Sequence, residues 1–299
     1  DDSAFNRGAI SKMLETDVGI EVVGVATDGV DAIGKTLRLG PDVITLDLEM
    51  PTMDGYTFLR WLMKERPTPV VVISSRSDSR SVFRALELGA VEFLAKPEAK
   101  ISKSIEAIRD ELIAKVHSIY HLELGKVQST IRLLAQERST PVLPKDEELV
   151  PRKGPIEVVA IAASTGGPPA IQAILTALPP DIAASIVIAQ HMPPGFTRSY
   201  AERLNKISSL VVSEAATGDR LRSGTALIAP GGHHLLVRRD RDGLFAALLP
   251  RQSADKYVPS ADMMMTSVAE VCGSATLGVV LTGMGNDGAA GATAIKRQR

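Results

Sequence analysis

The stretch IEVVAIAASTGGPPAIQAIL, residues 156–175, contains the transition that decides the fold of the second half of the chain. Its apolar first half predicts a strand buried on both faces, and Pro168 and Pro169 suit the first turn of a helix. Ser164 therefore ends a parallel strand, at the edge where open α/β sheets bind ligands. A serine on such a turn can be a hydrolytic nucleophile, but this segment taken alone favours a phosphate-binding loop or a simple tight turn.

The composition is that of an ordinary soluble globular protein. Of the 299 residues, 44% are hydrophobic and 23% are charged, which is enough chain for two domains. The formal net charge of -1 gives no electrostatic reason to expect nucleic acid or a membrane surface as a partner. The single Cys272 excludes an internal disulfide framework, and no signal peptide or apolar run of membrane-spanning length is visible. We therefore expect a cytoplasmic protein.

Residues 1–116 alternate short apolar strands with amphipathic helices. This alternation predicts a doubly wound parallel sheet of the flavodoxin-like kind. The strands are expected at residues 20–26, 42–48, 69–74 and 91–95.

Chemically competent side chains of this first domain fall where strands end. Asp47 ends one predicted strand, Ser74 the next and Lys96 the last, while Asp1 and Asp2 precede the first helix. A lone aspartate in such a position is usually a helix cap or a solvated charge. Clustered carboxylates repel each other, however, so the set together predicts a site for a hard cation such as Mg²⁺.

The runs DDS and DLEMPTMDG, with Ser74 and the Lys96–Pro97 pair, closely resemble the receiver domain of bacterial response regulators. The resemblance implies that Asp47 is the phosphorylated residue. It also implies that Asp2, with help from Asp1, holds Mg²⁺ and that the carbonyl of Glu49 completes the protein ligands.

By the same resemblance, Ser74 and Lys96 contact the phosphoryl group, and Phe93 occupies the aromatic switch position. The first strand of the receiver family is missing before Asp1, and the catalytic family described below continues beyond Arg299. We therefore expect both ends of this chain to be clipped.

The expected linker covers residues 117–153. An apolar helical stripe continues past the first domain, so its last helix can extend into the linker. Further on, residues 139–155 contain prolines and charges of both signs without periodicity, which is typical of an extended tether.

Residues 154–299 return to an α/β pattern and supply the partners that a serine nucleophile needs. A serine requires an imidazole to take its proton and a carboxylate to orient that imidazole. His191 directly follows a strongly apolar strand, and Asp287 lies in a glycine-rich turn after another. His233 and His234 are further candidates to line the same edge.

The runs ASTGGP, QHMPPGFT, APGGHH, PSADMMM and TGMGNDGAAG resemble the catalytic domain of the chemotaxis protein-glutamate methylesterase family. The resemblance implies that Ser164 is the nucleophile, His191 the base and Asp287 the carboxylate. It also implies an oxyanion hole near the backbone of Met284, with Thr165 as a neighbouring candidate.

This family places such a domain after a receiver. The resemblance therefore implies a phosphorylation-activated serine hydrolase that demethylates chemoreceptor glutamates and deamidates receptor glutamines. A chemotaxis histidine kinase would supply the phosphoryl group, with Mg²⁺ in the receiver, and the esterase reaction would need no cofactor. The alternative is a response regulator whose second domain binds a phosphorylated ligand or nucleotide without hydrolysis. A DNA-binding output is disfavoured by the net charge and the α/β pattern.

Overall fold

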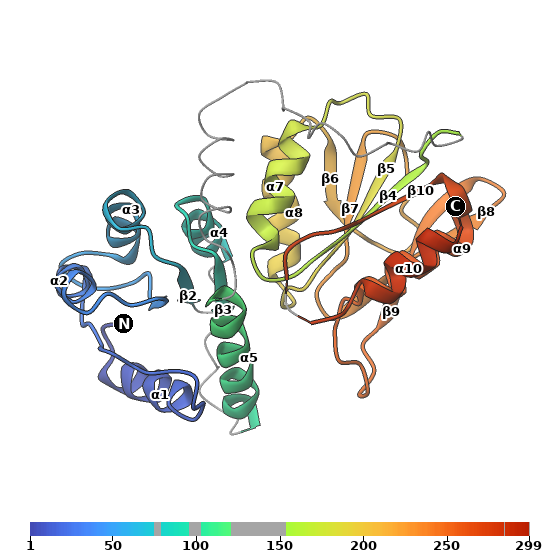
Figure 1. Ribbon diagram of the computed structural model, residues 1–299. Coiled ribbons are helices and arrows are strands. Elements are labelled where there is room, and N and C mark those ends of the chain that lie inside the picture. Colours follow the sequence, from blue (N-terminus) through green and yellow to red (C-terminus); the bar gives the residue numbers. More distant parts are fainter. Residues whose placement is uncertain (75–78, 96–102, 121–153, 284, 299) are drawn as a thin grey trace, which may run out of the picture.

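Two α/β units make up the part of the chain that the computed structural model describes (Figure 1). The described residues are 1–74, 79–95, 103–120, 154–283 and 285–298. No helix in these ranges is long and apolar enough to cross a membrane.

The N-terminal unit is built on a parallel sheet in the order β1-β2-β3. Its strands are β1 (Ile44–Leu46), β2 (Val70–Ser74) and β3 (Glu92–Ala95). All five residues of β2 are buried, as expected for a parallel strand covered on both faces. The register pairs Ile44 with Val70 and Val71 with Glu92.

Helices cover both faces of this sheet. They are α1 (Ala4–Leu14), α2 (Gly29–Leu39), α3 (Gly55–Glu65), α4 (Ser79–Glu87) and α5 (Lys103–Tyr120). Alternate residues of β2 enter different clusters: Val71 and Ile73 pack with residues of α1 and α5, whereas Val70 and Val72 pack with residues of α3 and α4. This alternation produces the doubly wound arrangement.

The helix starts follow the local sequence. The Ser3 side chain accepts the Asn6 N–H at the start of α1, and Asp54 accepts the Thr57 N–H at the start of α3. Helix α5 runs to Tyr120, past the expected domain end at residue 116. The remainder of the expected linker, residues 121–153, lies outside the described residues.

One expected strand is wrong. Residues 20–26 form no strand, although their apolar alternation resembles one. A strand is defined by ladder hydrogen bonds to a neighbour, and no described strand pairs with this segment. Instead, Val22 and Val25 line a cavity of about 570 Å³ together with Ile44 and Leu46 of β1.

The C-terminal unit contains a five-stranded parallel sheet in the order β10-β4-β5-β7-β6 and an antiparallel hairpin, β8 with β9. The sheet strands are β4 (Val158–Ala163), β5 (Ser185–Gln190), β6 (Val211–Glu214), β7 (Thr225–Ile228) and β10 (Thr276–Val280). The hairpin strands are β8 (His233–Asp240) and β9 (Gly243–Pro250). The predicted, mostly parallel α/β fold class is confirmed.

Two layers sandwich this sheet. The helices are α7 (Gly167–Ala177), α8 (Phe196–Ile207), α9 (Ala261–Cys272) and α10 (Ala289–Arg297), with a short 3₁₀ turn at Gly273–Ala275. In β4, Ile161 and Ala163 pack with α7 and α8, while Ala160 and Ala162 pack with α9, α10 and the hairpin.

The two units meet through α4, which contacts α7 and α8 (Figure 1). Phe83 stacks on Tyr200 with ring centroids 5.3 Å apart. Phe93 lies on β3, an edge strand of the N-terminal sheet, and its ring centroid is 4.7 Å from that of Phe196. Their buried side chains form one continuous apolar cluster that crosses the boundary between the units.

The three methionines of α9 provide a test of this packing. Met264 is fully buried, whereas Met263 is 36% exposed. We predict that Met264→Ala lowers the free energy of unfolding by about 2–5 kcal/mol, because it leaves a cavity under the sheet. The matched Met263→Ala should change it by less than about 0.5 kcal/mol. Urea unfolding of both variants would measure this, and equal losses would contradict the packing.

Candidate active site

Three neighbouring parallel strands bring the predicted catalytic side chains to one edge of the C-terminal sheet. Ser164 follows β4, His191 follows β5, and Asp287 lies in the loop after β10. Strand β4 lies between the other two. The chain moves from β4 toward β5 in one direction and returns to β10 on the other side, so this edge is a topological switch point, where open α/β sheets form ligand sites.

The three side chains form a continuous chain of hydrogen bonds. The Nδ1 atom of His191 lies 3.1 Å from Ser164 Oγ, and its Nε2 atom lies 2.8 Å from Asp287 Oδ2. An ionised carboxylate can only accept, so Nε2 carries the proton and Nδ1 is left to accept the Ser164 O–H. The two ring nitrogens have exchanged places relative to the serine-protease arrangement, in which Nε2 faces the serine.

Asp287 sits at the N-terminus of α9, where backbone donors are available. Its carboxylate accepts the Ser260 Oγ–H at 3.0 Å, the Ala261 N–H at 2.7 Å and the Asp262 N–H at 2.8 Å. Burial by itself would raise the pKa of Asp287, but the hydrogen bonds from His191 and from the Asp262 and Ala261 backbone hold that pKa below its usual value. The carboxylate is therefore ionised at neutral pH and available to His191.

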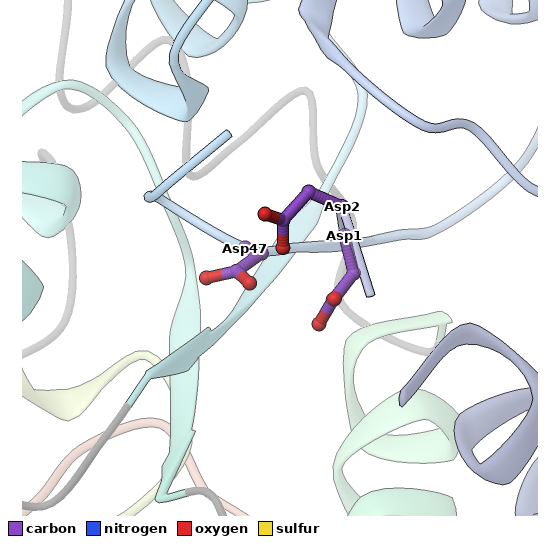
Figure 2. A group of neighbouring side chains, drawn as sticks. All are labelled: Asp1, Asp2 and Asp47. Carbon is purple, nitrogen blue, oxygen red and sulfur yellow. The ribbon is translucent and has the colours of Figure 1, made fainter. Parts of the chain in front are cut away.

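The acidic cluster predicted in the N-terminal unit is also present. The side chains of Asp1, Asp2 and Asp47 lie side by side (Figure 2), with carboxylate oxygens within 4.8 Å of one another. In octahedral Mg²⁺ coordination, oxygens lie up to about 4.2 Å apart, twice the metal–oxygen distance. The donor type therefore suits Mg²⁺, and the three carboxylates need to approach only slightly to reach that spacing.

Ser74, the last residue of β2, is buried at the carboxyl end of that strand beside β1, which leads into Asp47. The Glu49 N–H donates to Asp47 Oδ1 over a long 3.4 Å contact. Lys96 lies outside the described residues.

Comparison with known proteins agrees with both halves of this architecture. Residues 159–299 match the family described as CheB methylesterase, and residues 1–109 match the response regulator receiver domain. Over 310 residues the chain is 51% identical to protein-glutamate methylesterase/protein-glutamine glutaminase 3 of Geobacter sulfurreducens, covering 99% of this chain and 84% of that one. The chain belongs to this methylesterase family.

Other members of the methylesterase family are also similar. Protein-glutamate methylesterase/protein-glutamine glutaminase 1 of Myxococcus xanthus is 45% identical over 299 residues, covering 99% of this chain and 82% of that one. The crystal structure of the Thermotoga maritima CheB methylesterase catalytic domain is 40% identical, with a TM-score of 0.46, over 48% of this chain and 76% of that one. The family and two-domain fold class predicted from the motifs are confirmed.

The turn that carries Ser164 in this methylesterase fold is closely packed. The Gln190 side-chain amide donates to the carbonyls of both Ser164, at 2.9 Å, and His191, at 3.1 Å. A Cβ atom on Gly283 would lie only 2.6 Å from Ser164 Cβ, and one on Gly167 would lie 2.0 Å from Gln190 Oε1. These two glycines let neighbouring segments approach the turn.

Sequence reasoning missed three residues that surround Ser164, His191 and Asp287. Gln190 joins the backbones of Ser164 and His191, Ser260 bonds Asp287, and Tyr257 stacks on the His191 ring with centroids 5.0 Å apart. The only signal in the sequence was their position inside the QHMPPGFT and PSADMMM runs or, for Tyr257, two residues before the second run.

The remaining candidates lie in different surroundings. Thr165 is buried, and its carbonyl accepts the Thr282 Oγ1–H at 3.1 Å. Met284 lies outside the described residues. His233 is exposed, whereas His234 is only 2% exposed and bonds other groups, so the expectation that His234 lines the open edge is wrong. The side chain of His234 is buried because it points to the inward face of β8.

The lowered pKa of Asp287 gives a prediction for stability. A carboxylate with a depressed folded-state pKa contributes stability above its unfolded pKa and loses it as the pH falls through the folded value. We therefore expect Asp287→Asn to be less stable than the parent protein at neutral pH. The difference should shrink progressively below about pH 5, because a protonated carboxyl resembles the amide. Urea unfolding across this range would measure it, and a difference independent of pH would contradict the assignment.

Proposed function

We propose that this chain is a serine hydrolase that removes methyl esters from glutamate side chains of chemoreceptors in the cytoplasm. The same attack would deamidate receptor glutamines. The observation that carries the proposal is the hydrogen-bonded series Ser164, His191 and Asp287 at the switch point of the sheet. Membership of the methylesterase family supplies the substrate class.

In this reaction, Ser164 Oγ attacks the ester carbonyl carbon while His191 Nδ1 takes its proton. The imidazolium then gives that proton to the departing methoxy oxygen, so methanol leaves and an acyl-serine ester remains. Water attacks the acyl-serine with the same imidazole as base, which releases the glutamate and restores Ser164. Asp287 stabilises the imidazolium in both steps. For a glutamine substrate, the leaving group is ammonia.

The negative charge that develops on the carbonyl oxygen needs donors that are already in place. We assign this role to the backbone N–H of Thr165, the residue after the nucleophile, and to backbone N–H groups near Met284, in the loop after β10. A single such donor typically contributes about 10²–10³ in kcat.

The start of α7 argues against the alternative of a phosphate-binding output domain. A helix N-terminus binds phosphate through free backbone N–H groups. Here the Gly167 N–H already donates to the Ser164 carbonyl at 2.8 Å, and Pro168 and Pro169 have no N–H. Few donors remain for a phosphate at this turn.

Replacement of the nucleophile tests the hydrolase mechanism. We predict that Ser164→Ala abolishes covalent labelling by a serine-directed inhibitor and removes nearly all methanol release from methylated receptor fragments. Loss of a triad member leaves only a residual acceleration of about 10³–10⁴ over water. The control Ser209→Ala, at an exposed position, should retain the parental rate. Near-normal methanol release by Ser164→Ala would refute the mechanism.

We propose that the N-terminal unit receives a phosphoryl group on Asp47 from a chemotaxis histidine kinase. Asp1, Asp2, Asp47 and the Glu49 carbonyl would hold Mg²⁺, which neutralises charge on the phosphoryl oxygens. Ser74 and Lys96 would then contact those oxygens. The close approach of the three carboxylates supports this assignment.

We further propose that the unphosphorylated N-terminal unit restrains the active site through α7 and α8. Phe83 packs on Tyr200, whose hydroxyl donates to the Pro168 carbonyl at 2.8 Å, directly after the Ser164 turn. Phe93 packs on Phe196, which begins the helix after the His191 loop. Repacking of Phe93 on phosphorylation would therefore reach both catalytic turns.

An ion pair between Glu87 and Arg203 crosses the same boundary and allows a test without disturbing the core. We predict that Glu87→Arg and Arg203→Glu, made singly, each raise the unphosphorylated methanol-release rate by about 3- to 10-fold, because like charges would face each other. Each single variant should also respond less to a small phosphodonor with Mg²⁺. The double exchange restores opposite charges and should return both quantities toward the parent. Unchanged rates in both single variants would contradict this route of regulation.

A further inference from the structure

His234 is a buried histidine outside the triad with two fixed partners. It lies on β8 and is 2% exposed. Its Nδ1 atom accepts the Ser260 N–H at 3.1 Å, and its Nε2 atom lies 2.9 Å from Asp255 Oδ2. Because Nδ1 accepts an amide hydrogen, the ring proton is on Nε2 and is donated to Asp255. The tautomer and the ring orientation are thus both set.

Asp255 is itself held in place. The same Oδ2 atom accepts the Gln252 N–H at 2.6 Å. The hydrogen bond from His234, followed by that from the Gln252 backbone, lowers the pKa of Asp255, so this group is an ionised acceptor at neutral pH. The imidazole therefore connects a fixed carboxylate to the backbone at Ser260.

Ser260 is the residue through which this connection reaches the active site. Its N–H is bonded to His234, while its hydroxyl donates to Asp287 Oδ1 at 3.0 Å. The next two backbone N–H groups, of Ala261 and Asp262, also donate to Asp287. A displacement of the Ser260 backbone would move all three donors together.

His234 also contacts both ends of the segment between Asp255 and Ser260. Tyr257, near the middle of that segment, stacks on the His191 ring at an interplanar angle of 5°. The segment thus touches the base through Tyr257 and the carboxylate through Ser260. The contact of Tyr257 with His191 and that of Ser260 with Asp287 therefore both depend on how His234 of β8 holds residues 255–260.

We propose that His234 is a positioning residue for the esterase reaction, which orients Asp287 and His191 through Ser260 and Tyr257 without touching the substrate. This inference rests on the proposed function. The important feature of the side chain is the acceptor at Nδ1, since that atom bonds the Ser260 N–H. The Nε2–H bond to Asp255 orients the ring.

Two isosteric variants separate these atoms. In His234→Asn, the amide oxygen can occupy the Nδ1 position and still accept the Ser260 N–H. In His234→Gln, the amide nitrogen can occupy the Nε2 position and still donate to Asp255, but the Nδ1 acceptor is lost. We expect His234→Gln to lower kcat by about 10- to 100-fold with KM nearly unchanged, the scale of a small misplacement of catalytic groups. His234→Asn should recover most of that loss.

The pH profile provides a readout that a structural role alone would not change. When Asp287 shifts away from His191, the imidazolium loses stabilisation, so the acid limb of kcat/KM should move to lower pH in His234→Gln. Thermal unfolding of each variant would verify folding, and His233→Gln, the exposed neighbour on the opposite face of β8, is the matched control. The limb should be unshifted in His233→Gln.

Equal losses of kcat in His234→Asn and His234→Gln, or an unshifted limb in a folded His234→Gln, would overturn the proposal. Should His234→Gln fail to fold, Asp255→Ala and Asp255→Asn replace the pair, because only the asparagine still accepts the Nε2–H and so keeps the intact imidazole oriented with Nδ1 as the acceptor for Ser260. Equal rates in those two variants would overturn it as well. Methanol release by the parent protein, lost in Ser164→Ala, is measured alongside, so failure of the hydrolase function is distinguished from failure of the His234 role.

Discussion

The proposed catalytic arrangement of this methylesterase-family chain depends on the placement of one carboxylate at the start of a helix. Asp287 accepts three hydrogen bonds from the first turn of α9 and its cap, and a fourth from His191. The reverse contact also exists, since Asp262 Oδ1 accepts the N–H groups of Gly288 and Gly291. The loop after β10 and the start of α9 therefore determine each other's position. These donors hold the ionised carboxylate in place, so it orients the imidazole through a charge-assisted hydrogen bond.

This exchange of hydrogen bonds works because parallel strands deliver their following loops to one edge. Strand β4 pairs in parallel with β10 on one side and with β5 on the other. The residues that follow these three strands are therefore within reach of a single imidazole. Close approach also requires residues without side chains, and Gly283 and Gly167 provide it beside Ser164 and Gln190. The sheet sets the coarse position, and the glycines permit the final contact distances.

In the proposed regulation, the N-terminal unit acts on helices that begin at this same edge. Helices α7 and α8 begin shortly after Ser164 and His191, and these are the helices that α4 contacts. Aromatic pairs and one ion pair cross this boundary. Phe93 is therefore adjacent to the helix that follows the His191 loop, and Phe83 is adjacent to Tyr200, which bonds the Pro168 carbonyl after the Ser164 turn.

The sequence by itself determined the fold class, most of the elements and the residues that follow each strand. Hydrophobic periodicity and glycine or proline breaks are local, so they predicted the positions of Ser164, His191 and Asp47 at strand ends. Only the tertiary structure decided the partners: which imidazole nitrogen faces Ser164, that α9 supplies the donors for Asp287, and that His234 is buried against Ser260. It also decided that residues 20–26 form no strand. Hydrogen-bond partners separated by more than 20 residues, and pairing between strands, depend on three-dimensional proximity, which a local pattern does not encode.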